Sequence, residues 1–325
     1  MKSSVANIGI LSILVGISTV IASLVYGSDF NFYTAGNLAV LSQQIPIMGI
    51  VAIGAGFLMI SGEFDLSVAG VYTLAPFVMA IALSQWHMAP ALAIAAGCVC
   101  AAVVGLVNGW VTVALRVPSF IATLGMMFFL RGLVRWVSID AATGQPGPIA
   151  FNFGTGFQQA VSGQAAGGLF AQSWWLLGVM VVAALVLNRH SFGNHLFATG
   201  GDADAAEKTG IRTRSVKLVC FVICSLCAAL AGLMQSTRIG VVSPASTLNG
   251  LELSSIAACV VGGVFLMGGR GNVLGMVLGA ALLVIVENLL VLVRAPGEYS
   301  PAFIGTIVIV SVIFNSNFGS SNRKK

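Results

Sequence analysis

The chain has 325 residues, of which 58% are hydrophobic and 8% are charged. Because a soluble domain is typically about 45–50% apolar and about 25% charged, this composition excludes soluble enzymes and disordered scaffolds. The net charge of +5 comes from 15 basic and 10 acidic residues, which form no basic stripe with stacking aromatics of the kind that binds nucleic acid.

Continuous apolar runs predict an all-α polytopic membrane protein. The mean hydropathy is +0.99 and the chain contains 39 glycines, which are commoner in membrane helices than in soluble ones. A spanning helix needs about 20 apolar residues, and the runs lack the alternating pattern of a β-barrel. We expect one transmembrane domain over residues 1–325, with about ten spans near 8–27, 38–60, 66–84, 89–115, 118–137, 172–188, 216–236, 254–267, 273–293 and 300–315.

Two of these runs have alternative interpretations. The run at 8–27 follows a lysine, as the core of a signal peptide would, but its length favours an uncleaved first helix. The run at 254–267 is short, so it could be a broken or partial span.

The distribution of Lys and Arg predicts the orientation, because short cytoplasmic loops carry an excess of both. With ten spans and the N-terminus inside, the external side receives four basic residues, Arg131, Arg135, Arg238 and Arg294. The cytoplasmic side receives eleven, Lys2, Arg116, Arg189, Lys208, Arg212, Arg214, Lys217, Arg270, Arg323, Lys324 and Lys325. Both termini and the loop 189–215 are therefore predicted to be cytoplasmic, and the polar segment 138–171 external.

Two acidic residues, Glu63 and Asp65, interrupt the apolar sequence between the second and third predicted spans. Acidic groups next to hydrocarbon usually face the bundle interior or water, which makes Glu63, Asp65 and nearby Ser67 candidates for a translocation path. The alternative, which we favour, is that Asp65 or Ser67 caps the next helix by accepting hydrogen bonds from its first N–H groups.

Small residues recur in several runs. Glycines with four-residue spacing indicate helix faces that pack closely in lipid. Two such sets occur, Gly105 with Gly109, and Gly271 with Gly275 and Gly279. Cys224 and Cys227 form a CxxC pattern, but without a second ligand pair we interpret both as small buried side chains of a helix face. Five glycines and an arginine at 262–272 interrupt a run in a way that a continuous helix disfavours.

The polar segment 189–217 holds 8 of the 25 charged residues. Within it, Asp204 and Glu207 have the spacing of a capping box, and Gly210 could end the helix in a left-handed conformation. The segment therefore predicts a helix of one or two turns outside the bilayer. Composition alone leaves two interpretations open, a solvated basic loop and a helix that docks on a cytoplasmic partner.

Glu287 is the one charged residue of the 273–293 run. An intramembrane carboxylate is by default a candidate functional residue, so we include Glu287 among the path candidates. Arg131, Arg135 or Arg238 could pair with it; alternatively, Glu287 lies near the end of its helix and reaches water.

Sequence patterns of enzymes are missing. The chain contains no Gly-Lys dipeptide and hence no P-loop, no G-x-S-x-G nucleophile motif, and three histidines too dispersed for a metal site. We therefore expect no catalytic residue, no metal and no cofactor in this chain.

Taken together, these segments resemble the permease subunit of bacterial ABC importers for monosaccharides, the ribose-type family. The resemblance lies in "ISGEFDLSVAG", "VPSFIATLGMMFFLRGL", the segment from "NRHSFGNHLFATGGDADAAEKTG" into the following helix, and "SSIAACVVGGVFLMGGRGN". It covers about residues 40–315. This chain departs from the family pattern at Glu63 and Phe64, which replace a glycine and an isoleucine.

The resemblance implies a multi-pass protein of the bacterial inner membrane that imports a monosaccharide or polyol. It implies as partners a cytoplasmic ATPase subunit that uses the ATP, a periplasmic substrate-binding protein and a second permease copy or paralogue. By the same resemblance, the short helix is the coupling helix on which the ATPase docks, and its residues are Asp202, Asp204, Ala205, Ala206, Glu207 and Gly210.

Two other functions remain possible from the sequence. An ABC permease for a branched-chain amino acid has a similar arrangement of spans. A stand-alone carrier driven by H⁺ or Na⁺ would use Glu287 or Asp65 as its coupling carboxylate, but it would not need the capped helix in the cytoplasmic loop.

Overall fold

A computed structural model describes residues 30–140, 143–165, 169–248, 250–296 and 301–307, with a few isolated residues nearer the ends of the chain. The spans predicted at 8–27 and 300–315 lie largely outside these ranges. Within them, six helices are long and apolar enough to cross a membrane, and the shorter apolar helix Val68–Ser84 accompanies them. These helices establish a multi-pass α-helical membrane protein.

The helices follow the predicted apolar runs closely. In chain order the elements are α2 (Ala35–Ile60), α3 (Val68–Ser84), α4 (Pro90–Val113), α5 (Ser119–Val137), β1 (Ile149–Ala150), α6 (Thr155–Ser162), α7 (Ala171–Arg189), α8 (Ser191–Gly201), α9 (Ala203–Lys208), α10 (Thr213–Ile239), β2 (Val241–Val242), the 3-10 helix η3 (Pro244–Leu248), α11 (Leu251–Val261) and α12 (Val273–Leu292). Helix α11 has 11 residues and is about 16 Å long, roughly half of a hydrocarbon core. It is therefore a partial span.

Local signals explain where several helices begin and end. Thr34 precedes α2, and its side chain accepts a hydrogen bond from the backbone N–H of Asn37. Asn272 caps α12 in the same way by accepting from Gly275, and α10 ends at Gly240 with φ of +75°. Because lipid offers no hydrogen bonds, such caps satisfy the terminal backbone groups that the helix cannot pair internally.

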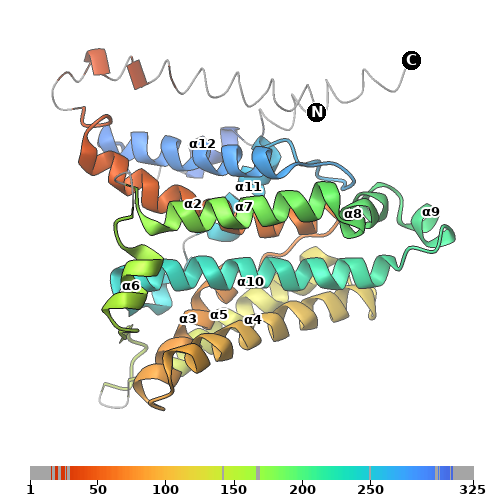
Figure 1. The fold of residues 1–325 in the computed structure, drawn as a ribbon, viewed down its shortest axis with the longest axis horizontal. Coiled ribbons are helices and arrows are strands. Elements are labelled where there is room, and N and C mark those ends of the chain that lie inside the picture. The colour runs from red at the N-terminus through yellow and green to blue at the C-terminus, as the bar shows by residue number, and fades with distance from the viewer. Residues whose placement is uncertain are drawn as a thin grey trace.

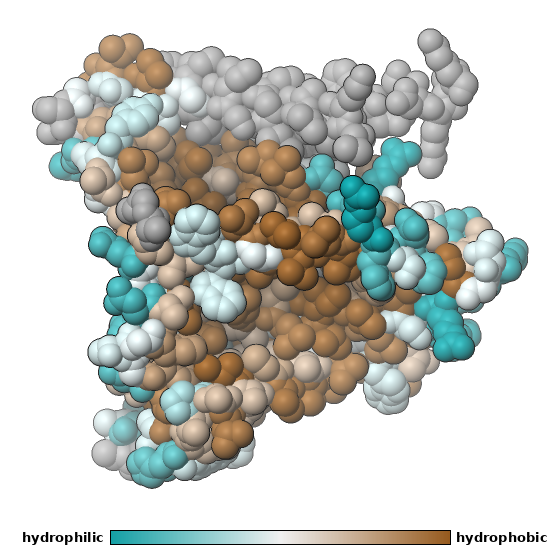
Figure 2. Space-filling model, viewed as in Figure 1, coloured by the Kyte–Doolittle hydropathy of each residue, from teal (hydrophilic) through white to brown (hydrophobic). Residues whose placement is uncertain are grey.

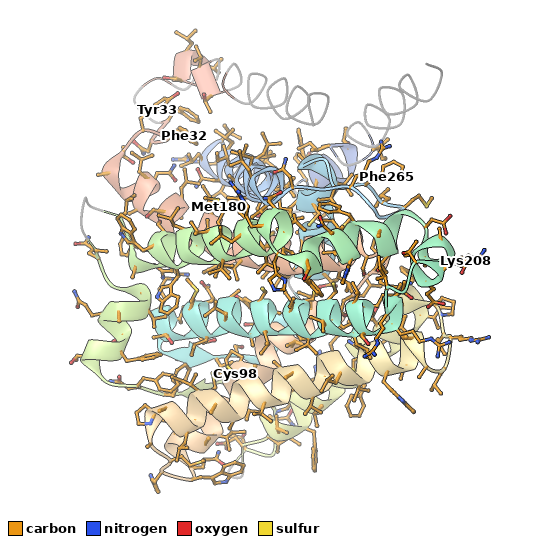
Figure 3. The ribbon with its side chains drawn as sticks, turned by 45° about the vertical axis from the view of Figure 1, so that its right-hand side comes forward. Phe32, Tyr33, Cys98, Met180, Lys208 and Phe265 are labelled. Carbon is orange, nitrogen blue, oxygen red and sulfur yellow. The ribbon has the colours of Figure 1, made fainter. Side chains whose placement is uncertain are left out.

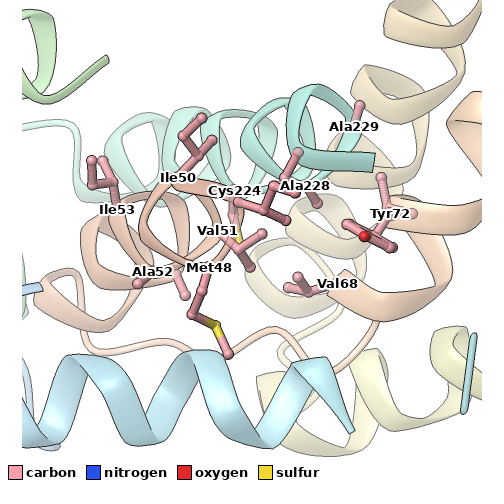
Figure 4. Packing of buried hydrophobic residues seen from close by; sticks show 14 of the residues in the cluster. Met48, Ile50, Val51, Ala52, Ile53, Val68, Tyr72, Cys224, Ala228 and Ala229 are labelled. Carbon is pink, nitrogen blue, oxygen red and sulfur yellow. The ribbon is translucent and has the colours of Figure 1, made fainter. Parts of the chain in front are cut away.

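Helices α2 and α10 form an antiparallel pair at the centre of the bundle (Figure 1). Their polar contacts show the direction: Lys217 at the start of α10 lies 2.6 Å from Glu63, just after α2. Arg238 at the end of α10 donates to Gln43 in the first half of α2. Between these contacts the two helices bury a continuous apolar interface, in which α3 also takes part (Figure 4).

The helices around this pair form two similar units. Helix α10 packs on α3 and α4, and α2 packs on α11 and α12. One unit therefore consists of α10, α3 and α4, and the other of α2, α11 and α12, so each has two long helices and one short helix. An arginine with positive φ follows the last helix of each unit, Arg116 at +57° after α4 and Arg294 at +56° after α12. The long helices α2 and α10 of the two units run in opposite directions. Each short helix also begins near an acidic-Leu-Ser sequence, at Asp65 in one and Glu252 in the other.

Glycines allow the helices of each unit to approach closely, as their spacing predicts. A side chain at Gly275 or Gly279 would overlap backbone carbonyls of Gly262 or Ala258 in α11 and the turn after it. On α4, a side chain at Gly105 would lie 2.8 Å from the carbonyl oxygen of Phe221 in α10. These contacts are backbone on backbone, which is how small residues stabilise helix pairs in lipid.

The surface has a broad apolar band with polar residues at both ends of the bundle (Figure 2). Helix α6 and the strands β1 and β2 lie at one end, and α8 and α9 lie at the other (Figure 1). The antiparallel β1–β2 pair joins Ile149 to Val242 and Ala150 to Val241, so it ties the segment 138–171 to the end of α10. The two polar segments singled out in the sequence are thus on opposite sides of the apolar band.

Candidate functional site

Helix α9 forms the tip of the structure at one end of the bundle, and Lys208 at its end points away from the other helices (Figures 1 and 3). The helix has six residues, within the predicted one to two turns. Asp204, Ala205 and Lys208 are exposed, whereas Ala206 is buried. One face of α9 therefore anchors it to the protein, and the opposite face is free for a partner.

The cap of α9 lies at a different residue from the one expected. The side chain of Asp202, not Asp204, accepts from the backbone N–H of Ala205 at 2.9 Å, so the capping-box interpretation of Asp204 and Glu207 is wrong. Glu207 instead accepts a hydrogen bond from the hydroxyl of Thr213 at the start of α10. Asp202 directly precedes α9 and can cap it, whereas Asp204 lies inside the helix.

The other end of α9 is as predicted. Gly210 has φ of +89°, and the backbone N–H of Ile211 donates to the carbonyl of Ala206 at 3.1 Å. This six-to-one bond is the mark of a Schellman motif. It turns the chain sharply from α9 into α10.

The structure also contains a helix that the sequence analysis did not predict. Helix α8, eleven residues long, follows α7 after a break at His190, whose ring nitrogen accepts from the backbone N–H of Phe192. Asp202 ends α8, where its N–H donates to Ala198, and it also begins α9. The polar segment 189–217 therefore contains a compact pair of helices.

Asp65 and Ser67 form a buried hydrogen-bonded cluster in the turn between α2 and α3. The backbone N–H and the hydroxyl of Ser67 both donate to one carboxylate oxygen of Asp65, at 2.7 and 2.6 Å. Asn108 of α4 donates to the Ser67 hydroxyl at 2.8 Å. Burial raises the pKa of Asp65, and the hydrogen bonds that Asp65 itself accepts from Ser67 and Asn108 oppose the shift. The expected cap of α3 by either side chain is wrong, because Ser67 precedes the helix without a side-chain capping hydrogen bond. Asp65 accepts from Ser67 itself and not from an N–H of the first turn of α3.

Glu63, two residues earlier, has a different environment. Its carboxylate pairs with the ammonium group of Lys217 on α10 at 2.6 Å, and both side chains are mostly buried. This pair could not be predicted from the sequence, because the two residues are 154 positions apart. It joins the turn after α2 to α10, the helix that follows α9.

Glu287 lies half-buried on α12, and no hydrogen bond or ion pair to it is found among the described residues. Neighbouring Asn288 exchanges amide hydrogen bonds with Asn37 of α2, at 3.0 and 2.8 Å. Two of the arginines considered as partners of Glu287 have other partners, since Arg238 binds Gln43 and Arg131 binds a different glutamate, described next.

Arg131 of α5 forms an ion pair with Glu252 at the start of α11, at 3.0 Å. Glu252 is 6% exposed, and its second carboxylate oxygen and the Nε of Arg131 have no hydrogen-bond partner in the described part of the chain. Sequence analysis singled out neither residue as half of this pair. The acidic-Leu-Ser pattern shared with Asp65 is the signal that could have identified Glu252.

A cavity of about 770 Å³ opens between α2, α7 and α10. Its wall is almost entirely apolar and includes Phe57, Trp174 and Trp175. A site for a polar solute needs several hydrogen-bonding groups, so this cavity does not have the chemistry of such a site. The CxxC residues Cys224 and Cys227 lie at the same α2–α10 contact, next to Gly54.

A bundle of membrane-spanning helices with a capped helical pair at one polar end defines a polytopic membrane protein. The chain belongs to the family described as "Branched-chain amino acid transport system / permease component", whose match covers residues 37–312. The expectation of a permease subunit of an ABC importer is thereby confirmed. No solved structure matches the chain.

The similar proteins include three named "Autoinducer 2 import system permease protein LsrC". Those of Yersinia pestis (strain Pestoides F) and Yersinia pseudotuberculosis serotype O:1b (strain IP 31758) are each 30% identical over 297 residues, which cover 88% of this chain and 79% of the relative. That of Yersinia enterocolitica serotype O:8 is also 30% identical, over 88% of this chain and 77% of the relative. The similarity thus extends over most of both proteins.

Proposed function

We propose that this permease forms the translocation path for a monosaccharide or related polyol across the bacterial inner membrane. A separate cytoplasmic ATPase subunit hydrolyses the ATP, a periplasmic binding protein delivers the solute, and a second permease copy or paralogue completes the path. The observation that carries the proposal is the capped α8–α9 pair at one end of a bundle that matches a permease family over residues 37–312. The similar Yersinia proteins are named as permeases of an autoinducer 2 import system. Autoinducer 2 is therefore a further candidate solute.

The end of the bundle that carries α8 and α9 also indicates how the permease is oriented in the membrane. Helices α8 and α9 lie opposite α6 (Figure 1), and the basic residues concentrate in the loop that contains α9. The positive-inside rule then places α9 in the cytoplasm and α6 outside. Ten spans with both termini in the cytoplasm are the arrangement that we propose.

Each coupling residue has a distinct role in this proposal. Asp202 and Gly210 fix the two ends of α9, Ala206 anchors it, and Glu207 ties it to α10 through Thr213. Asp204 and Ala205, which are exposed, are left to contact the ATPase. A short helix held at both ends transmits force better than a flexible loop, because less motion is lost within the loop itself.

For the path, we propose Glu287 as the residue with free hydrogen-bonding capacity, since none of its contacts among the described residues uses its carboxylate. Sugars are bound through such acceptors for their hydroxyl groups. Glu63, Asp65 and Ser67 remain candidates only if the turn that they form opens during transport, because their side chains bind one another or Lys217 in this structure.

A branched-chain amino acid is the second candidate solute, because the family description names that class. Uptake in cells that express the permease with its ATPase and binding protein separates the candidates. We expect accumulation of a labelled pentose or hexose, or of autoinducer 2, that excess leucine does not reduce. Accumulation of labelled leucine without uptake of any sugar would contradict the proposed substrate class.

A further inference from the structure

The turn between α2 and α3 is held from both ends of the cytoplasmic loop. From the far end of the loop, Lys217 reaches Glu63 in this turn at 2.6 Å, with 22% and 14% of the two side chains exposed. At that depth an ion pair keeps more of its Coulomb attraction than it would in water. Lys217 lies one turn into α10, directly after the segment that α9 and Gly210 connect to it.

From the near end of the loop, the last turn of α8 lies against the last turn of α2. A Cβ atom at Gly200 would overlap the carbonyl oxygen of Ile60, so only glycine allows this approach. The same carbonyl accepts a hydrogen bond from the N–H of Gly269, at 2.8 Å. The end of α8, the end of α2 and the turn before α12 thus meet at one backbone junction.

The turn that receives these contacts is itself bonded to α5. The N–H of Phe64 donates to the hydroxyl of Ser119 at 3.2 Å, and the N–H of Leu66 donates to that of Thr123 at 3.1 Å. A continuous set of contacts therefore runs from α9 and α10 through Glu63 to the first turns of α5.

We infer that Glu63 and Lys217 are positioning residues that make the α2–α3 turn and α5 move together with the cytoplasmic helices when the ATPase acts. The inference rests on the proposed function. Among the described residues no hydrogen bond joins α8 to α2 at the Gly200 junction, whereas the ion pair fixes the turn to α10 at one atom pair. Without it, the α8–α9 pair can move while the turn and α5 stay behind.

The direct test measures whether the two parts move as one body. Spin labels on Asn194→Cys in α8 and Phe120→Cys in α5, both exposed positions, report their separation in the complete importer with and without ATP. The same complex without the two introduced cysteines, which keeps its six native cysteines, measures the signal from labelling of native residues. We expect one narrow distance, unchanged by ATP, in the otherwise unsubstituted protein, and a second, ATP-dependent distance in Lys217→Met and Glu63→Gln.

Matched variants separate coupling from stability. Lys217→Arg keeps the charge and is expected to restore the single distance, and the double variant Glu63→Gln/Lys217→Met is expected to match either single variant. Arg214→Met removes an exposed charge three residues earlier and should change nothing. A single, ATP-independent distance in Lys217→Met, or the second distance in Lys217→Arg, overturns the inference.

Transport gives a second readout in proteoliposomes, with labelled D-ribose as the probe solute. Each single variant should lower ribose uptake per ATP hydrolysed about five- to tenfold, the range of a moderate coupling between sites, while ATPase recovery with the permease stays normal. Unchanged uptake per ATP in both single variants counts against the inference. If the unsubstituted importer takes up no ribose, the proposed substrate class is at fault, and the distance measurement still decides the coupling.

Discussion

Ala205→Arg is expected to reduce the amount of ATPase that co-purifies with the permease at least tenfold. Ala205 is exposed near the middle of α9, at the tip of the structure. A small residue at the centre of a docking helix lets the partner approach the backbone, and a long charged side chain there prevents close contact. Losing one central contact of an interface costs about 2 kcal/mol or more, which exceeds a factor of ten in affinity.

Two further variants complete this experiment. Asp204→Lys reverses an exposed charge on the same helix and should weaken recovery to a smaller extent. Glu207 is kept, because its hydrogen bond to Thr213 is part of the loop itself. Thr155→Arg in α6, exposed at the opposite end of the bundle, serves as the control. Equal ATPase recovery with Ala205→Arg and with the control would remove the docking role from α9.

Gly275→Leu is expected to prevent the permease from folding into a stable, monodisperse protein. A side chain at Gly275 would overlap the backbone carbonyl of Gly262, so α11 and α12 would have to separate along their contact. Overpacking usually costs about 1–3 kcal/mol, and we expect the upper end or more here because both opposing groups are backbone. Against a total stability of about 5–15 kcal/mol, that is a large loss.

Size-exclusion chromatography and thermal unfolding in detergent measure this effect. The control is Gly125→Leu, because a side chain at this glycine of α5 would meet no atom within 4 Å. A wild-type elution profile and unfolding temperature for Gly275→Leu would show that the α11–α12 contact is not the tight packing described above.

The positions of the spanning helices could be predicted from the sequence because lipid imposes a simple rule. Each span must be apolar and must satisfy its own backbone hydrogen bonds, so a continuous apolar run such as 89–115 appears as helix α4 almost unchanged. The glycine faces followed for the same reason, since the spacing of Gly275 and Gly279 along a helix identifies one face. Both rules concern residues that are close together in the sequence.

Contacts between distant segments could not be predicted in this way. The pairs Glu63–Lys217 and Arg131–Glu252 join residues 154 and 121 positions apart, and only the three-dimensional arrangement brings them together. The sequence analysis also proposed arginine partners for Glu287 from charge alone. In the structure Arg131 pairs instead with Glu252 at the start of α11, and the side chain of Glu252 is more deeply buried than that of Glu287.

The polar segment 189–217 shows how little composition alone predicts about the structure of a polar segment. Helix α8 begins at a histidine cap and ends in two glycines, which are weak signals compared with Ser, Thr, Asp or Asn at a first position. The shift of the α9 cap from Asp204 to Asp202 has a related cause. Two aspartates two residues apart both fit a capping pattern, and the end of α8 at Asp202 determines which one is used.

The central claim is that import is driven by ATP hydrolysis on another chain and not by an ion gradient. Initial rates of solute uptake into proteoliposomes test it, with the permease reconstituted alone or with its ATPase and binding protein. We predict uptake only when the ATPase and ATP are both present, and no response to an imposed proton or sodium gradient. Uptake by the permease alone that follows such a gradient would contradict the account and would identify an ion-coupled carrier.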